Sequence, residues 1–274
     1  MVSSVDPLGS WRAALEAWAI PERILAAAPE SPWVLPTELF ARRTDAQVER
    51  PSGAAHERAA EALPAAGTIL DVGAGAGAAS LPLTSAGTLI AVDENPDLLA
   101  ELEIRAARRQ LKSMAIVGRW PDVADRVPSA DVVVCSHVLY NVPDLGPFVT
   151  ALHEHARRRV VVEITARHPL SGLNPLWRRF HGIDRPERPT WEDAASGIRT
   201  LGIDPQVEVY RRSAATASMS SFEALVRMTR IRLCLAPARE AEVAAALVER
   251  GANRTNPTTW TSSDPELVAL WWDA

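Results

Sequence analysis

A carboxylate and three closely spaced glycines stand together near residue 71 and could form a ligand site. Asp71 ends an apolar run, and Gly73, Gly75 and Gly77 follow it at alternate positions. Glycine adopts positive φ readily and, having no side chain, lets a ligand approach the main chain. Asp93 ends the next apolar run, twenty residues beyond Gly73, where a carboxylate can accept hydrogen bonds from ribose hydroxyls. These residues predict a site for a flat or phosphorylated ligand close to the backbone.

Two classes of ligand fit this arrangement. The glycines match the G-x-G-x-x-A pattern of dinucleotide-binding proteins, in which the N-terminus of a helix binds the pyrophosphate. Asp71 argues against a dinucleotide, because a carboxylate beside a pyrophosphate opposes its binding. A cationic ligand without phosphates would be attracted by the same carboxylate. The loop therefore favours a phosphate-free cation, with a dinucleotide as the alternative.

Short apolar segments alternate with helical segments in the surrounding sequence and would position these residues. The strands expected are 68–72, 89–93, 114–117, 130–135 and 160–165, and the helices expected between and before them are 53–63, 79–85, 96–111 and 145–157. Continuous runs of valine, isoleucine and leucine suit strands buried on both faces, as in a parallel sheet covered by helices. The predicted fold class is therefore α/β and doubly wound, with ligands bound at the carboxyl ends of the strands.

Three segments resemble motifs of class I S-adenosylmethionine-dependent methyltransferases, in the branch that acts on small molecules. I-L-D-V-G-A-G-A-G is similar to their first motif, L-I-A-V-D-E-N-P-D-L-L to their second, and A-D-V-V-V-C-S-H-V-L-Y-N-V-P-D-L to their fourth-strand segment. The resemblance covers roughly residues 50–165. It implies a mostly parallel seven-stranded sheet with helices on both faces, closed by an antiparallel C-terminal strand pair that 206–210 and 267–272 would supply.

The resemblance also implies roles for individual residues. Asp71 would orient the loop and the amino-acid end of S-adenosylmethionine, and Asp93 would bind both ribose hydroxyls. Many family members carry an acid directly after the glycine that ends the third strand, whereas this chain continues Gly118-Arg119-Trp120-Pro121-Asp122. Asp122 could take that role after a shift, and Trp120 could pack on the adenine or anchor the core or surface. The predicted cofactor-binding residues are Asp71, Gly73, Ala74, Gly75, Gly77, Asp93, Glu94, Arg119, Trp120 and Ser136.

Methyl transfer from a sulfonium requires that nucleophile, methyl carbon and sulfur be held in line. A general base helps where the nucleophile is a hydroxyl or a protonated amine. His137 and Tyr140 directly follow the fourth strand and are the catalytic candidates, although His137 could instead be a hydrogen-bonded wall residue. Glu163 lies within the fifth strand and requires a partner, because burial of an unpaired carboxylate is costly. The reaction requires no metal, and the sequence offers no convincing set of metal ligands.

Two segments are candidate lids over the substrate. Residues 1–50 would be an N-terminal helical extension, and residues 166–190 a poorly periodic insert in a methyltransferase domain that spans 51–274. Long loops inside compact domains are usually functional, and this insert is rich in arginine and aromatic residues, which favours an aromatic or anionic acceptor. The predicted substrate and lid residues are Trp33, Phe40, Asn141, His168, Trp177 and His181.

Composition argues against several classes of protein. The net charge of −5 argues against broad nucleic-acid binding, which requires a positive field. No apolar stretch approaches the roughly 18 residues of a membrane span. Cys135 and Cys234 lie in or beside apolar runs and are typical of buried thiols in a reducing compartment. We therefore expect a cytoplasmic monomer or homodimer with no membrane partner.

The function predicted from the sequence is S-adenosylmethionine-dependent methyl transfer to an oxygen or nitrogen of a small molecule. An NAD-dependent oxidoreductase is an alternative, but it would use a Tyr/Lys or Ser/Tyr pair, and Lys112 is the only lysine. A nucleic-acid methyltransferase using the arginine-rich segment is a second alternative and predicts salt-sensitive binding. A third is a protein that binds the cofactor without turnover.

Overall fold

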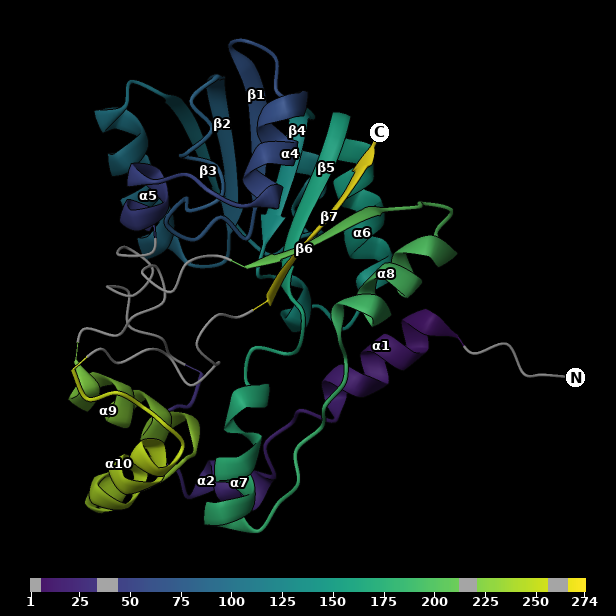
Figure 1. Cartoon of the computed structure of the whole chain (residues 1–274). Helices are drawn as coiled ribbons and strands as arrows, with labels where there is room; N and C mark the ends of the chain where they lie inside the picture. Colours follow the sequence, from purple (N-terminus) through teal and green to yellow (C-terminus); the bar gives the residue numbers. More distant parts are fainter. Residues whose placement is uncertain (1–5, 34–43, 212–220, 256–265) are drawn as a thin grey trace, which may run out of the picture.

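A seven-stranded sheet forms the centre of the computed structural model, which describes residues 6–33, 44–211, 221–255 and 266–274 (Figure 1). The strand order is β3-β2-β1-β4-β5-β7-β6. The strands are β1 Gly67–Val72, β2 Ala86–Asp93, β3 Lys112–Val117, β4 Ala130–Ser136, β5 Ala156–Thr165, β6 Gln206–Arg211 and β7 Glu266–Asp273. Strands β1 to β5 are parallel, and β7 runs antiparallel between β5 and β6. The predicted fold class, with its antiparallel C-terminal pair, is confirmed.

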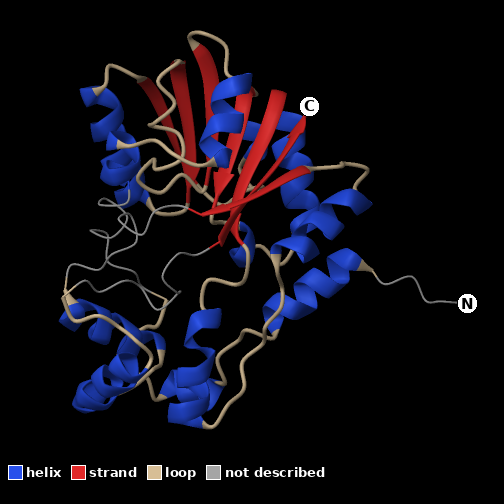
Figure 2. Cartoon of the chain, in the orientation of Figure 1, coloured by secondary structure: helices blue, strands red, loops and turns tan. Residues whose placement is uncertain are grey.

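Helices cover both faces of this sheet, as Figure 2 shows. Alternate strand residues point to opposite faces, so that Leu70 packs in the core on one face and Ile69 in the core on the other. The first face is covered by α1 (Pro7–Glu16), α6 (Leu145–His155) and α8 (Trp191–Thr200), and the second by α4 (Ala54–Ala62) and α5 (Pro96–Arg108). Both faces of the central strands are therefore buried, as their apolar sequences predict.

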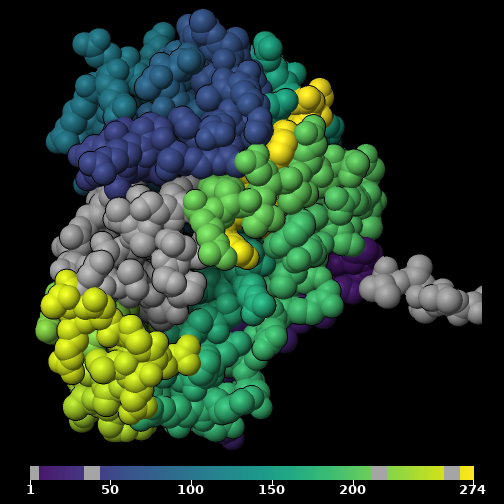
Figure 3. All heavy atoms as spheres, in the orientation of Figure 1, coloured from purple at the N-terminus to yellow at the C-terminus, as the bar shows by residue number. Residues whose placement is uncertain are grey.

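A separate hydrophobic cluster is formed by four helices, which we call the helical unit. It consists of α2 (Glu22–Ala26), α7 (Asn174–His181), α9 (Phe222–Arg232) and α10 (Glu240–Glu249). Figures 1 and 3 show it below the sheet, on the side to which the parallel strands run. Because it combines segments from both ends of the chain, the N-terminal segment and the insert predicted at 166–190 meet within it.

Three local predictions differ from the structure. Residues 79–85 form turns in place of a helix, because Pro82 cannot donate a backbone hydrogen bond. The helix expected to end at residue 157 ends at His155, and β5 begins at Ala156, so Arg157-Arg158-Arg159 belongs to the strand and not to a helix end. The insert is not irregular throughout, because it contains α7.

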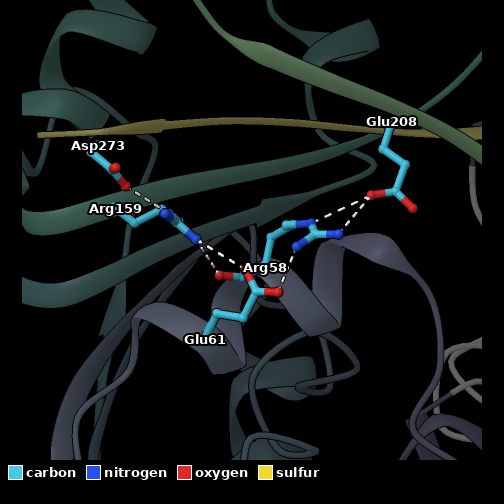
Figure 4. Close-up of polar contacts among 5 residues, drawn as sticks. All are labelled: Arg58, Glu61, Arg159, Glu208 and Asp273. Atoms are coloured by element: carbon cyan, nitrogen blue, oxygen red, sulfur yellow. Dashed lines mark hydrogen bonds and ion pairs between the residues drawn. The ribbon is translucent and has the colours of Figure 1, made fainter.

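A network of ion pairs ties α4 to the antiparallel end of the sheet (Figure 4). Arg58 on α4 pairs with Glu61 and with Glu208 on β6, the latter at 3.1 Å. Arg159 on β5 pairs with Asp273 on β7 at 2.7 Å and with Glu61 at 3.4 Å, and it also donates to the Arg58 carbonyl. Charged residues of α4 thus pair with β5 and β6, and Arg159 extends the network from β5 to β7. Networks of this kind contribute more than isolated surface pairs do.

Candidate active site

A cleft of about 2170 Å³ lies between the carboxyl ends of the parallel strands and the helical unit. Ligand pockets usually measure roughly 300–1,000 Å³, so the cleft has room for two ligands together. Most residues predicted from the sequence line it, namely Trp33, Asp71, Gly73, Ala74, Gly75, Asp93, Glu94, Arg119, Trp120, Ser136, His137, Tyr140, Asn141 and His168. Gly77, Trp177 and His181 do not line it, and Phe40 lies outside the described residues.

The three glycines of the loop after β1 all have positive φ, but they differ in the space around them. A side chain at Gly73 (φ +70°) would place its Cβ 2.3 Å from Cγ2 of Val138, and one at Gly77 (φ +90°) would meet Leu81 at 2.7 Å. A Cβ at Gly75 (φ +50°) would meet no atom within 4 Å. Gly73 and Gly77 therefore serve the packing of the loop, whereas Gly75 leaves open space on its cleft side where a ligand can approach the backbone.

Asp93, at the end of β2, holds this loop in place. Its Oδ2 accepts a hydrogen bond from the backbone N–H of Gly75 at 2.8 Å, and its Oδ1 accepts one from that of Asn95 at 2.9 Å. Each carboxylate oxygen has a second lone-pair direction. Asp93 can therefore position Gly75 and still accept hydrogen bonds from hydroxyls in the cleft.

Asp71 is a buried carboxylate without a charged partner in the described part of the chain. It is 1% exposed, and within the described part of the chain neither of its oxygens has a hydrogen-bond partner. Burial raises its pKa to about 7; the nearby Ser80 hydroxyl offsets part of this rise, and the charge of Asp93 adds to it. An ionised carboxylate here would be stabilised by a cationic ligand in the cleft.

The residues after β3 divide between the surface and the core. The side chains of Arg119 and Glu94 are exposed, and Arg119 Nε lies 3.8 Å from Glu94 Oε1. Trp120 is buried, donates its indole N–H to the Phe148 carbonyl at 3.3 Å, and packs edge-on against His155. Of the two roles considered for Trp120, this packing favours the core anchor, although part of its surface also lines the cleft.

His137 forms a close pair with Glu163 at the ends of β4 and β5. Its Nε2 lies 2.9 Å from Glu163 Oε1, and its backbone N–H donates to the Glu163 carbonyl at 2.8 Å. The hydroxyl of Tyr210 on β6 donates to the other carboxylate oxygen of Glu163, which is 3% exposed. The pair forms because Ser136 stands beside Glu163 in the sheet register. Sequence reasoning required a partner for Glu163 but identified neither His137 nor Tyr210 in that role.

This pairing orients the imidazole. A carboxylate accepts hydrogen bonds only, so it assigns the proton of neutral His137 to Nε2 and leaves Nδ1 as the proton acceptor. The backbone of His137 has φ +61°, an uncommon conformation for a non-glycine residue that often marks functional sites. The arrangement can therefore abstract a proton from a group bound in the cleft.

Tyr140 and His168 form an uncharged aromatic wall. The Tyr140 hydroxyl donates to the Thr165 carbonyl at 2.8 Å, and burial raises its pKa above the ordinary range. His168 stacks on Trp18 with ring centroids 3.8 Å apart and meets Tyr140 edge-on at 5.1 Å. Burial, with the charge of Arg185, lowers the His168 pKa to about 3. Neither side chain is charged at neutral pH, so both contribute shape and not proton transfer.

The remaining substrate candidates lie at the mouth of the cleft or in the helical unit. Trp33 is 52% exposed and Asn141 is also exposed, and both line the cleft. Trp177 is buried in the helical unit, and His181 bonds through Nε2 to the Leu233 carbonyl at 2.7 Å. Within the described ranges no group of three or more His, Cys, Asp or Glu side chains could hold a metal ion, and no helix there is long and apolar enough to cross a membrane.

Comparisons with known proteins agree with this architecture. Residues 69–159 match the family model of a methyltransferase domain, and a search of curated proteins found no match. The YcgJ protein of Bacillus subtilis is similar in structure, with a TM-score of 0.53 and 14% identity over 80% of this chain and 97% of that one. A cyclopropane-fatty-acyl-phospholipid synthase-like protein of Lactobacillus casei has a TM-score of 0.53 and 13% identity over 92% and 98%. A candidate sarcosine dimethylglycine methyltransferase of Galdieria sulphuraria has a TM-score of 0.52 and 12% identity over 92% and 95%.

Proposed function

We propose, from the confirmed resemblance to class I S-adenosylmethionine-dependent methyltransferases, that this protein transfers a methyl group from S-adenosylmethionine to an oxygen or nitrogen of a small molecule. The match of residues 69–159 to a methyltransferase domain supports the reaction class. The identity of the cofactor and the class of acceptor are inferred from the chemistry of the cleft.

The observation that carries the proposal is the buried carboxylate of Asp71 beside the glycine loop, which has no ion-pair partner among the described residues. Such a group opposes a pyrophosphate and favours a ligand with a cationic end, as the amino-acid part of S-adenosylmethionine has. Asp93 lies on the neighbouring strand and has lone pairs for the two ribose hydroxyls. The open space at Gly75 admits the part of the cofactor that joins them. The residues present therefore fit this cofactor better than a dinucleotide.

When bound, S-adenosylmethionine supplies an electrophilic methyl group, and the protein positions and deprotonates the acceptor. His137 Nδ1 accepts the proton of an acceptor hydroxyl or protonated amine. Glu163 holds the imidazole through Nε2 and stabilises the imidazolium that forms, and Tyr210 orients Glu163. The cleft between the sheet and the helical unit holds the acceptor in line with the methyl group, so that a large part of the rate enhancement comes from alignment.

The remaining sequence predictions enter this proposal as well. Within the predicted segments 1–50 and 166–190, we infer that α2 and α7, which belong to the helical unit, act as lids over the domain predicted at 51–274. α1 instead packs on the sheet, and α9 and α10 of the predicted domain belong to the helical unit. We place the protein in the cytoplasm as a monomer or homodimer, and the two buried free thiols, Cys135 and Cys234, support a reducing compartment.

Calorimetric titration with S-adenosylhomocysteine and, separately, with NAD tests the proposal. We expect the first ligand to bind and the second not to bind, because only the first lacks a pyrophosphate. Release of methylated product from a panel of hydroxyl and amine acceptors then distinguishes an enzyme from a protein that only binds the cofactor. Binding of NAD alone would overturn the proposal and would leave Asp71 without an explanation.

The raised pKa of Asp71 predicts pH-dependent cofactor binding. In the ligand-free protein the folded state keeps a proton that the unfolded chain releases above about pH 4. The stabilisation due to this group is therefore present below pH 4 and is lost as the pH rises through about 7. The α-ammonium group of S-adenosylhomocysteine favours the ionised form of Asp71, so affinity should rise by up to about ten-fold from pH 6 to pH 8, with release of a proton.

Calorimetry in two buffers of different ionisation enthalpy measures this proton directly. Asp71→Asn is the matched control, because it keeps the shape of the side chain and removes the titration. We expect weaker binding and no change with pH in that variant. The same pH profile in both proteins would show that another group is responsible.

A further inference from the structure

Arg232, at the end of α9, is a buried cation without an ion pair. It is 9% exposed, its Nη1 donates to the Pro32 carbonyl, and its Nε has no hydrogen-bond partner. No carboxylate within the described ranges lies at ion-pair distance from it. Burial lowers the pKa of its guanidinium, with no opposing contribution from an acid. The protein therefore holds this charge in an unfavourable environment.

Arg230, two residues earlier on the same helix, provides an internal comparison. It is 2% exposed and pairs with Glu30 and with Glu240, the latter at 3.1 Å. Buried charges are costly unless they are paired, and Arg230 meets that requirement twice. Arg232 has no such carboxylate partner within the described ranges, which points to a counter-ion supplied by a bound ligand.

Arg232 lines a small recess of about 10 Å³, together with Trp18, Trp33, Trp177 and Arg185. Among the described residues, no carboxylate belongs to the lining of this recess. Trp18, Trp33 and Arg232 also line the large cleft, so the recess adjoins it. The volume suits a single water-sized group, such as one oxygen of a carboxylate, and excludes a ring or a phosphate.

Aromatic side chains connect the recess with the catalytic end of the cleft. Trp18 stacks on His168, and His168 contacts Tyr140 at the end of β4. The Arg185 guanidinium lies 5.4 Å from the ring centre of Trp18 and donates to the Ala19 carbonyl at 2.9 Å. A continuous series of largely buried aromatic rings therefore leads from a cationic recess toward His137, and the 52% exposed ring of Trp33 adds an open aromatic surface.

We propose that the methyl acceptor is an aromatic carboxylate whose carboxylate group enters this recess and pairs with Arg232, while its ring lies along the aromatic wall. The inference rests on the proposed function, because it names the acceptor class of the same cleft. Charge-assisted hydrogen bonds to a guanidinium are about twice as strong as neutral ones. Loss of the negative charge should therefore reduce affinity by about ten-fold or more.

Matched pairs of small aromatic acids and amides test this proposal by calorimetry on the full chain saturated with S-adenosylhomocysteine. Suitable probes are benzoate and benzamide, cinnamate and cinnamamide, and indole-3-acetate and indole-3-acetamide. We expect the acid of at least one pair to bind about ten-fold more tightly than its amide. Arg232→Met should abolish this preference. Arg250→Met should keep it, because Arg250 is an exposed cation that lines the same cleft.

Arg232→Met could lose the acid preference simply because it fails to fold. Arg232→Lys separates this structural effect from the loss of charge, because it keeps the positive charge. Retention of the acid preference in the lysine variant supports the inference, and its loss opposes it. An acid preference absent from the wild type, or lost equally in Arg232→Met and Arg250→Met, overturns it. Titration with S-adenosylhomocysteine alone separates the two proposals: binding without an acid preference overturns only the acceptor class, whereas no binding overturns the proposed function.

Discussion

Asp93→Ala is expected to weaken the binding of S-adenosylhomocysteine by at least about a hundred-fold while the protein remains folded. Under the proposed ribose assignment, the variant loses two hydrogen bonds from ribose hydroxyls to a charged acceptor, each worth about 1.5–3 kcal/mol. It also releases the backbone N–H of Gly75, which Asp93 holds at 2.8 Å, so the loop after β1 becomes less well ordered for the ligand. Calorimetry measures the affinity, and circular dichroism and thermal melting establish that the fold is intact.

Asp97→Ala is the matched control for this substitution. Asp97 lies in the exposed first turn of α5, four residues beyond Asp93, and its removal changes the net charge by the same amount. We expect its affinity to remain within about three-fold of the wild type, because exposed charges at this distance are largely screened. An equal loss in both variants would attribute the effect to net charge, and unchanged affinity in Asp93→Ala would refute the ribose assignment.

His137→Asn is expected to reduce the rate of methyl transfer by about 10²–10⁴-fold, the usual contribution of a general base. Asparagine tolerates the positive φ of this position better than most residues do, so the backbone should persist. Affinity for S-adenosylhomocysteine should change little, because the proposed role lies in proton transfer. Steady-state rates with an acceptor found by screening, together with calorimetry, measure the two quantities separately.

Three further substitutions establish how the proton is handled. Glu163→Gln keeps the shape of the partner and removes the charge that stabilises the imidazolium, so the rate should fall with little change in cofactor affinity. Tyr210→Phe should have a smaller effect in the same direction. Tyr140→Phe removes a hydroxyl that donates to the Thr165 carbonyl and should leave the rate nearly unchanged. If His137→Asn mainly weakens cofactor binding, His137 is a wall residue and not a base.

The alternating part of the fold was predictable from sequence because its signals are local. The apolar runs that end at Asp71 and Asp93 identify β1 and β2, and their positions in parallel strands place both carboxylates at one edge of the sheet. The glycines between them indicate a close approach of ligand to backbone. Each of these inferences needs only neighbouring residues and the geometry of a parallel sheet.

The remaining features depend on contacts between distant segments. The pair of His137 and Glu163 requires the register of β4 against β5, and no local pattern encodes it. Arg230 on α9 and Glu30, in the bend after α2, are 200 residues apart, so periodicity cannot predict that these segments come together in the helical unit. The helix predicted at 79–85 is absent for another reason. The apolar spacing suggested a helix, but Pro82 and the preceding glycine loop prevent one from forming.

The position of β7 in the sheet has a consequence for the synthesis of the protein. β7 is translated after every other strand, yet it lies between β5 and β6. Until it leaves the ribosome, β6 has no strand to pair with, and Tyr210, which stands opposite Leu267, is not held beside Glu163. The five parallel strands can assemble on a nascent chain, whereas the support of His137 is completed only afterwards. A premature stop codon before residue 266 would therefore yield a chain that contains the cofactor loop. That chain would lack the strand that holds Tyr210 beside the pair of His137 and Glu163.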